Sequence, residues 1–260
     1  SAMQLAMGPP YNPSSVHVYG RAARMIIEEA RADIAMLAGC RGADLVFTSG
    51  GTEANNLALS MFDTIITSAV EHDSVMQAAP DAKRIPVDSE GCVNLAALGE
   101  MLASLDDSAR SRTLVSVMTA NNETGVIQPV DEIVALAKSA GVAVHSDMVQ
   151  ALGKQHLDFA GSGLDFASLS AHKIGGPGGV GALLVRPGRA MTSLIRGGGQ
   201  EQGRRSGTEN VIGIAGFGGA AKAAFGDIAH YRAMAAWRDG LEARVASQRN
   251  DAVLFGAGAD

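Results

Sequence analysis

The feature that most constrains the fold of this chain is a regular alternation of short apolar runs with longer helix-like segments. Seven runs have the length and composition of buried strands, and they span Asp44–Thr48, Thr64–Ser68, Arg84–Val87, Thr113–Met118, Val142–Ser146, Phe166–Leu169 and Gly181–Val185. The helix-like segments between them include Ala54–Met61, Leu95–Leu105 and Val130–Ser139. A long helix is also predicted at Tyr19–Leu37, with a polar side formed by Arg21, Arg24, Glu28, Glu29 and Arg31. This alternation predicts a three-layer α/β fold, with helices on both faces of a mostly parallel, seven-stranded sheet.

The pattern changes near the C-terminal end of the sequence. Two consecutive helices are predicted, over Glu209–Phe225 and Ile228–Ser247. The apolar run Ala252–Phe255 that follows has the composition of the first strand of a second domain. We therefore expect a large domain over residues 1–225, and a linker helix with the beginning of an incomplete small domain over residues 226–260.

Composition supports a close-packed domain and excludes several kinds of partner. Hydrophobic residues make up 47% of the 260 residues and glycine occurs 32 times, which is typical of an α/β domain. The net charge is −6 and no basic stripe is visible, so we expect no nucleic-acid partner. No apolar run reaches membrane-spanning length and no signal peptide opens the chain, so no membrane partner is expected. The two cysteines, Cys40 and Cys92, lack metal-ligand spacing and cannot form a disulfide framework, which favours a reducing, cytoplasmic location and no metal.

A lysine stands between a predicted strand and a glycine-rich turn, in Ser170-Ala171-His172-Lys173-Ile174-Gly175-Gly176. Side chains at the carboxyl ends of parallel strands lie in the ligand crevice of an α/β sheet. A lysine that loses its proton there is a nucleophile toward aldehydes and forms a Schiff base with a carbonyl cofactor such as pyridoxal phosphate (PLP). Taken alone, the segment slightly favours a surface lysine in a glycine loop over a Schiff-base lysine. The residues at the other strand ends are therefore needed to distinguish the two interpretations.

A second strand is followed by Ser49-Gly50-Gly51-Thr52-Glu53-Ala54-Asn55-Asn56, which opens a helix. Glycines let the backbone approach an anion, and a helix N-terminus offers unpaired N–H groups and the positive end of the helix dipole. Thr52 adds a hydroxyl donor. These features are typical of a phosphate-binding turn, and the missing P-loop lysine disfavours a nucleoside triphosphate. A capped helix after a tight turn explains the same residues equally well.

Three further strand ends carry polar residues. Asp147 would pair with a protonated pyridine nitrogen and keep the ring an electron sink, although a helix N-cap is its simpler interpretation. Gln150 would donate to the phenolic oxygen of the ring. His72 would stack on the ring and exchange protons, or be an ordinary half-buried histidine. Asn121 and Asn122 are either turn formers or amide donors. Each signal is moderate alone, but their combination at successive strand ends favours a complete PLP site.

These motifs make the chain resemble the cysteine desulfurases of iron–sulfur cluster assembly, within the class V aminotransferases, a group of fold-type I PLP enzymes. The resembling segments are Asn12–His17, Thr48–Leu59, Ser68–His72, Ala120–Pro129, His145–Lys154, Ser168–Val185 and Gly197–Asn210. The resemblance implies a PLP-binding large domain of a cytoplasmic, homodimeric transferase. It also implies that L-cysteine becomes L-alanine and that sulfur passes, through an enzyme persulfide, to an acceptor or iron–sulfur scaffold protein.

The resemblance assigns roles around the ring of the cofactor. Lys173 carries PLP as a Schiff base and then moves protons on the substrate carbon. His72, the second catalytic residue, stacks over the ring. Asp147 pairs with the pyridine nitrogen, and Gln150 faces the ring hydroxyl. Asn122 lies near the ring and the substrate.

The resemblance also indicates which residues bind the phosphate group of PLP. Gly51, Thr52, Ser170 and His172 hold this group. Thr208 reaches the phosphate bound by the neighbouring subunit, which implies a homodimer with shared active sites.

The sequence departs from the family pattern in its sulfur chemistry. The family's persulfide cysteine and its substrate-binding arginine follow the Arg205–Asn210 motif, and no cysteine occurs after Cys92. Neither Cys40 nor Cys92 matches the catalytic position. Met148 and Gly175 stand where the family usually has a small residue and an aromatic one.

From these departures we expect little or no activity of this chain by itself. Because Ala252–Phe255 would start an element that has no partner, we expect a fragment of a full desulfurase rather than a naturally truncated paralogue. The alternatives are another class V PLP enzyme, such as a selenocysteine lyase or an aminotransferase, and a non-catalytic PLP-binding or dimerisation module. A cysteine loop and an arginine further along the full-length gene would separate these alternatives.

Overall fold

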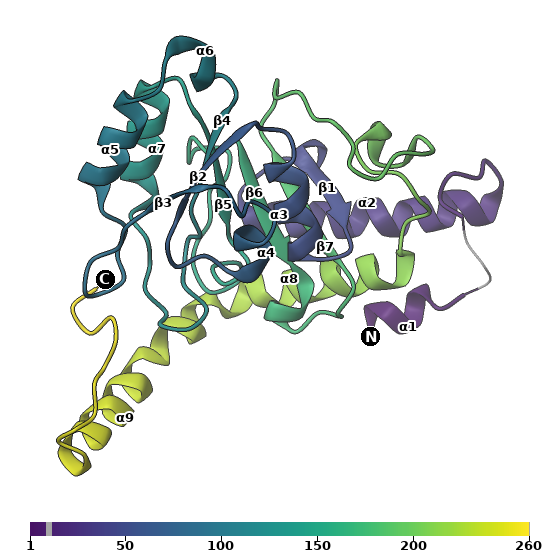
Figure 1. The fold of residues 1–260 in the computed structure, drawn as a ribbon. Helices are drawn as coiled ribbons and strands as arrows, with labels where there is room; N and C mark the ends of the chain where they lie inside the picture. The colour runs from purple at the N-terminus through teal and green to yellow at the C-terminus, as the bar shows by residue number, and fades with distance from the viewer. Residues whose placement is uncertain (9–11, 260) are drawn as a thin grey trace.

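A seven-stranded sheet forms the centre of the computed structural model, which describes residues 1–8 and 12–259 (Figure 1). The strands are β1 (Leu45–Thr48), β2 (Thr64–Ser68), β3 (Lys83–Ile85), β4 (Thr113–Ser116), β5 (Ala143–Asp147), β6 (Phe166–Ser170) and β7 (Gly181–Val185). Their order is β1-β7-β6-β5-β4-β2-β3. β7 runs antiparallel to both of its neighbours, and every other pair is parallel. The predicted mostly parallel, seven-stranded sheet is therefore confirmed.

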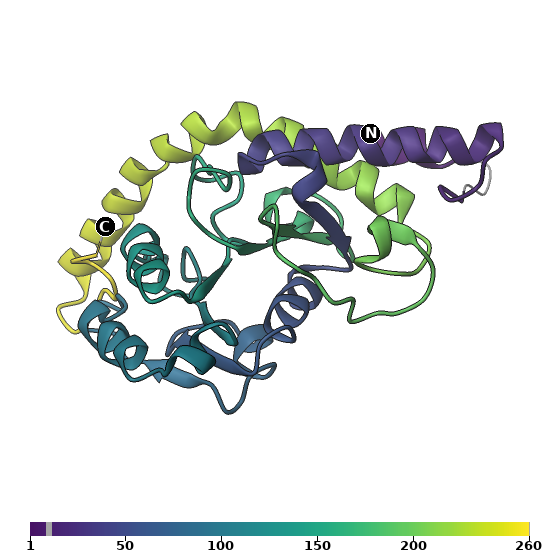
Figure 2. The same cartoon turned by 90° about the horizontal axis from the view of Figure 1, so that it is seen from above.

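Helices cover both faces of this sheet, as Figure 2 shows from above. The helices are α1 (Ala2–Ala6), α2 (Val18–Ala38), α3 (Gly51–Leu59), α4 (Asp73–Met76), α5 (Leu95–Ala103), α6 (Asp107–Arg110), α7 (Val130–Ser139), α8 (Val211–Ala233) and α9 (Ala235–Gln248). The described residues also form three short 3-10 helices, η1 (Gly42–Asp44), η2 (Ala171–Ile174) and η3 (Gln200–Gly203). One buried cluster joins the sheet to α2, α5, α7 and α8, and the other joins it to α3 and α4.

The strands have a hydrophobic core on each side because alternate residues point to opposite faces. In β1, Leu45 and Phe47 belong to the cluster under α2 and α8, whereas Val46 belongs to the cluster under α3. Helices α2 and α8 pack closely where a Cβ on Gly218 would lie only 2.6 Å from Ala30 Cα. Both faces of the sheet are thus buried, and polar strand residues such as Thr67 and Ser168 are buried together with the apolar ones.

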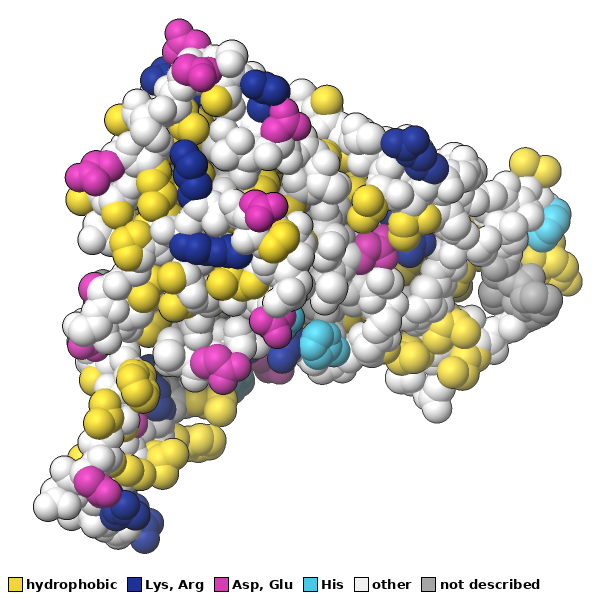
Figure 3. All heavy atoms as spheres, viewed as in Figure 1, with side chains coloured by type: hydrophobic (Ala, Val, Ile, Leu, Met, Phe, Trp, Pro, Cys, Tyr) yellow, Lys and Arg dark blue, Asp and Glu magenta, His cyan; other side chains and the backbone are white. Residues whose placement is uncertain are grey.

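The two predicted C-terminal helices exist, but the break between them lies elsewhere. Helix α8 continues through Gly226 to Ala233, and α9 starts after Met234. The expected boundary at residues 225/226 therefore falls inside α8. Helix α9 has no buried residue and projects away from the sheet, with exposed hydrophobic side chains along it (Figure 3).

Two expectations about the C-terminal region are wrong. Ala252–Phe255 is not a strand, because no strand pairs with it among the described residues. In addition, the helical stretch Val211–Gln248 is long and apolar enough, by length and composition, to cross a membrane. Apolar residues of its α8 part such as Ile214 and Phe217 are buried in the core, whereas Phe225, further along the same helix, is 46% exposed.

Candidate active site

One cavity at the carboxyl edge of the sheet brings together nine of the ten predicted site residues. Its volume is about 170 Å³. The lining residues are Gly51, Thr52, Asn55, His72, Ser74, Met118, Ala120, Asn122, Asp147, Val149, Gln150, Ser170, His172 and Lys173. The tenth predicted residue, Thr208, lines a separate cavity of about 210 Å³.

Sheet topology explains why these distant residues meet. Strands β2, β4, β5 and β6 are parallel, and β1 has the same direction because antiparallel β7 lies between β1 and β6. The segments that leave these five strands therefore start from one edge of the sheet. This edge is the usual ligand-binding edge of an open α/β sheet.

Lys173 lies on η2, directly after β6, in an exposed position at the cavity. Gly175 ends η2 with a φ of 82°, a left-handed conformation that glycine adopts without strain. The glycine that replaces the family's usual aromatic residue is thus suited to this turn. No hydrogen bond or ion pair joins the Lys173 ammonium to another of the described side chains, so its amine is available to a ligand.

Asp147 provides a buried carboxylate at the end of β5. Its Oδ2 accepts a hydrogen bond from Asn55 Nδ2 (2.7 Å), and its Oδ1 accepts one from the Val149 backbone N–H (2.9 Å). Burial raises the pKa of this carboxyl, and no ion pair with a cationic side chain of the described chain offsets the cost. A cationic group in the cavity would stabilise the carboxylate, so Asp147 fits the protonated ring nitrogen of PLP.

Asn55 connects the carboxylate to the histidine. Its amide also donates to Ser74 Oγ (2.8 Å), and Ser74 Oγ lies 2.8 Å from His72 Nδ1. His72 Nδ1 accepts a further hydrogen bond from the Ser74 backbone N–H (3.0 Å), because His72 caps the N-terminus of α4. With Nδ1 used as an acceptor, the neutral ring of His72 carries its proton on Nε2. Asn55 and Ser74 are site residues that sequence reasoning missed.

The N-terminus of α3 fits a phosphate group. Helix α3 begins at Gly51 without a side-chain cap, so its first N–H groups are available to an anion. A Cβ on Gly51 would lie 2.9 Å from Val149 Cγ2, so the close approach requires glycine. Ser170 Oγ lies 2.8 Å from His172 Nδ1. Glu53, in the first turn of α3, is neutralised by Arg205 (2.9 Å) and does not oppose an anion.

A second carboxyl group lies behind the cavity. Glu71 Oε1 accepts hydrogen bonds from Ser68 Oγ (2.5 Å) and from the Met118 backbone N–H (2.9 Å), whereas its Oε2 is buried without a partner. Burial raises the pKa of Glu71 to about 8, so this group is mostly protonated at neutral pH.

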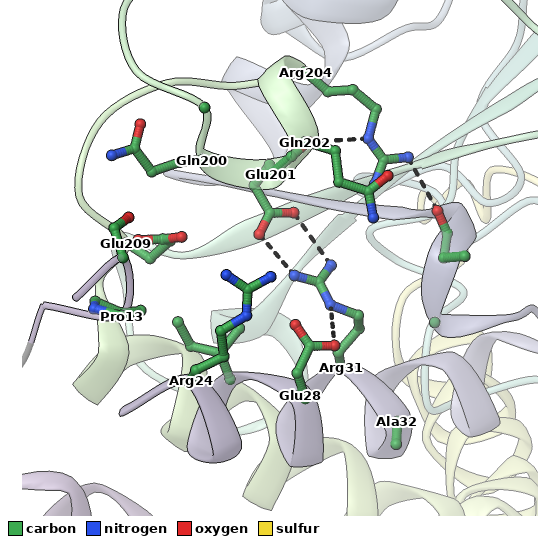
Figure 4. Close-up of a pocket in the computed structure, with 15 residues that line it drawn as sticks. Pro13, Arg24, Glu28, Arg31, Ala32, Gln200, Glu201, Gln202, Arg204 and Glu209 are labelled. Atoms are coloured by element: carbon green, nitrogen blue, oxygen red, sulfur yellow. Dashed lines mark hydrogen bonds and ion pairs between the residues drawn. The ribbon is translucent and has the colours of Figure 1, made fainter. Parts of the chain in front are cut away.

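A larger cavity, about 400 Å³, lies between α2 and the loop that contains η3 (Figure 4). Arg31 and Glu201 form a two-point ion pair there, with Nη2–Oε1 and Nη1–Oε2 distances of 2.7 and 3.2 Å. Arg31 was expected on the polar side of its helix, but it is 9% exposed, because Glu201 compensates its charge. Glu201 also accepts from the Phe47 backbone N–H (3.0 Å), so this cluster fixes the loop to the sheet.

The cysteines are poor candidates for sulfur chemistry. Cys40 is half-buried at the end of α2, and burial raises the pKa of its thiol to about 12. A thiol with this pKa contains almost no thiolate at neutral pH. Cys92, in the turn before α5, does not line the cavity.

Comparisons with known proteins agree with the resemblance seen in the sequence. Residues 9–248 match the family model described as aminotransferase class-V. The chain is 40% identical to an "IscS-like cysteine desulfurase" of Mycobacterium tuberculosis (99% of this chain, 69% of that protein) and 38% identical to "Cysteine desulfurase NifS" of Azotobacter vinelandii (90% and 61%). The X-ray structure of a "NifS-like protein" from Rickettsia africae superposes with a TM-score of 0.93 at 38% identity (99% and 73%). The chain spans 55% to 69% of the length of eight such curated relatives.

Proposed function

Because the chain belongs to the aminotransferase class-V family, we propose that it is the cofactor-binding part of a PLP-dependent cysteine desulfurase. The whole enzyme would convert L-cysteine to L-alanine and pass the sulfur to an acceptor protein, as in iron–sulfur cluster assembly. The observation that carries the proposal is the cavity, in which an unpaired lysine, a buried carboxylate and an uncapped helix N-terminus lie together.

The cavity residues have distinct proposed tasks in holding PLP. Lys173 binds the aldehyde carbon through its amine. Asp147 pairs with the ring nitrogen, and Gln150 donates to the ring oxygen. The helix end at Gly51 and Thr52 binds the phosphate, together with the hydroxyl and imidazole of Ser170 and His172, while Asn122 lies beside the ring and the substrate.

PLP, when bound, supplies an electron-accepting ring to the α-carbon of the substrate. Lys173 then holds or releases a proton at its Nζ, next to that carbon. His72 stacks on the ring and exchanges its proton at Nε2, since Nδ1 is used in capping α4. Asp147 keeps the ring nitrogen protonated, and Asn55 keeps Asp147 oriented.

Sulfur transfer requires a thiolate that this cavity does not contain. The raised pKa of Cys40 argues against it as the attacking group. We propose that the persulfide cysteine and the carboxylate-binding arginine lie in the part of the relatives' length that this chain does not span. In the same view, residues 1–225 form the large domain, residues 226–260 lead into a small one, and the enzyme works in the reducing cytoplasm.

Thr208 is proposed to serve a second subunit. It lies outside the cavity of its own chain, in a separate cavity together with Ser49 and Arg205. A hydroxyl in this position would be used if a second copy presented its cofactor phosphate there. The proposed enzyme is thus a homodimer with shared sites.

A spectrum tests the cofactor assignment. Addition of PLP should produce the visible absorbance of the lysine-linked cofactor, and Lys173→Ala should abolish it, because the covalent link requires this amine. Lys222→Ala, on an exposed part of α8, is the matched control and should keep the band. An unchanged band in Lys173→Ala would refute the assignment. Alone, this chain should release at most traces of sulfide from L-cysteine, and full turnover with alanine formation would contradict the proposed division of tasks.

A further inference from the structure

Lys154 does not line the cavity itself, but it contacts one side chain that does, Gln150. The chain after Asp147 folds into consecutive turns, with Leu152 N–H bonded to Met148 O (2.9 Å) and Lys154 N–H bonded to Ala151 O (3.0 Å). These turns bring the side chains of Gln150 and Lys154 together, and Lys154 Nζ donates to Gln150 Oε1 at 2.6 Å. Gln150 lines the cavity, whereas Lys154 is half-buried behind it.

This contact determines which end of the Gln150 amide is available to a ligand. An amide has an acceptor oxygen and a donor NH₂ of almost the same shape, so its orientation depends on its partners. An ammonium has three donors and no acceptor, and therefore it can pair only with the oxygen. Once Oε1 is held by Lys154, the NH₂ of Gln150 is the end that remains for another partner.

We propose that Lys154 is a positioning residue that fixes the Gln150 amide with its NH₂ available to the cavity, which selects an anionic ring oxygen on the bound cofactor. The inference rests on the proposed function, because the ring oxygen is that of PLP. Without Lys154, the amide is free to turn and present its oxygen, which would repel an anionic oxygen.

The charges around the cavity agree with this arrangement. Burial, and then the nearby charge of Lys173, lower the pKa of Lys154, so the two ammonium groups are close enough to interact. The other titratable groups of the cavity are His172 on η2, Asp147 at the end of β5 and His72 before α4. Lys154 therefore adds positive charge on the side where the cofactor would bear an anionic oxygen.

The test compares PLP binding to the wild-type chain and to Lys154→Met, which keeps the length of the side chain but removes its donor. Loss of the amide orientation should weaken PLP binding about tenfold, the effect of roughly one hydrogen bond to a charged group. The pH midpoint of the visible band should rise, because both the donor to the ring oxygen and a nearby positive charge are lost. Lys154→Arg, which retains charge and donors, should restore both properties. Lys222→Met is the surface control and should behave like wild type.

The same Lys154 substitution in a Gln150→Leu variant distinguishes an effect on the orientation of the Gln150 amide from a general effect of the Lys154 charge. In Gln150→Leu there is no amide to orient, so adding Lys154→Met should not weaken PLP binding further. An equal loss of affinity in both backgrounds, or wild-type affinity and pH midpoint in Lys154→Met, would overturn the inference and leave the proposed function intact. Absence of a visible band in the wild type, or its persistence in Lys173→Ala, would instead overturn the proposed function and this inference with it.

Discussion

Asn55 organises the polar side chains of the cavity, although its own side chain is fully buried. One amide hydrogen goes to Asp147 and the other to Ser74, so the orientation of the carboxylate and that of His72 depend on the same residue. The sequence places Asn55 in a segment notable for its glycines and Thr52. Nothing in that segment distinguishes the inward-facing Asn55 from Asn56, which bonds to the backbone of its own helix.

The buried side chain of His145 should make the free energy of unfolding depend on pH. Its Nδ1 lies 2.8 Å from Ser116 Oγ and its Nε2 lies 2.9 Å from Ser168 Oγ, so the ring connects β4, β5 and β6. Burial lowers the pKa of His145 to about 3, whereas an unfolded chain protonates histidine near pH 6.5. Between these values the unfolded state binds more protons. The free energy of unfolding therefore falls as the pH falls, by up to about 1.4 kcal/mol per pH unit from this residue.

Urea unfolding from about pH 7 down to about pH 5 measures this slope. His145→Gln should reduce it, because glutamine does not titrate, while His156→Gln, at an exposed position, should leave it unchanged. Equal slopes for wild type and His145→Gln would contradict the prediction.

At the level of elements, the strands and the existence of the last two helices were predictable, whereas the break between those helices was not. Strands such as β2 and β7 were found at their predicted bounds, because each is a short run rich in β-branched or aliphatic residues between longer helix-like segments. The α8–α9 break was misplaced because Gly226 and Asp227 resemble a helix end, yet the helix continues through them to Ala233. Ala252–Phe255 has strand composition but no paired neighbour, and pairing cannot be read from composition.

The carboxyl edge of the sheet was predictable for the same reason as the strands. Residues directly after a strand must lie at its end, which is why nine proposed site residues line one cavity. Asn55, Ser74 and Lys154 were missed because their contacts depend on helix rotation and turn geometry. The roles of the grouped residues remain predictions for the spectroscopic tests.

Asp165 connects several elements at the start of β6, and its removal should destabilise the sheet. Its fully buried carboxylate pairs with Lys138 Nζ of α7 (2.5 Å) and with Arg189 Nε (2.7 Å), and it accepts from the Val144 N–H of β5 (2.8 Å). Asp165→Asn leaves these two cations, and Arg186 Nε at 3.9 Å, without their counter-ion. Since these cations remain partly exposed, we expect a loss of about 3 kcal/mol, at the lower end for a broken buried pair.

Asp63→Asn is the matched control, because Asp63 pairs with Arg112 at 3.0 Å but both side chains are exposed. This pair should contribute less than about 1 kcal/mol. Urea unfolding of the two variants measures the difference, and similar losses for both would show that Asp165 does not connect these elements.

At the level of the whole molecule, the proposed position of Thr208 predicts that two defective chains complement each other. In a mixed dimer of Lys173→Ala and Thr208→Ala subunits, one site combines an intact Lys173 with the intact Thr208 of the other subunit. Random mixing would then make about a quarter of the sites intact. PLP affinity and visible absorbance, measured before and after subunit exchange, should show tight sites that appear only in the mixture.

Thr208→Ala alone should weaken PLP binding about tenfold, by loss of one hydrogen bond to a charged phosphate. Ser206→Ala, two residues earlier and bonded to the Gly198 carbonyl of its own loop, is the comparison for a general disturbance of the loop. Wild-type PLP affinity in Thr208→Ala, or a mixture that equals the average of its parents, would contradict the shared site.

The Arg31–Glu201 cluster also covers the backbone groups at the β1 edge of the sheet. Strand β1 is one of the two terminal strands, and its outer N–H and C=O groups would normally be open to another chain. Glu201 already accepts from the Phe47 N–H, and Arg31 Nη1 and Arg204 Nη2 already donate to the Leu45 carbonyl (2.9 and 3.2 Å). Three side chains thus take the place of an eighth strand. The β1 edge is therefore closed to a further strand, so a second chain that extended this sheet by strand addition would have to pair with β3 at the opposite edge.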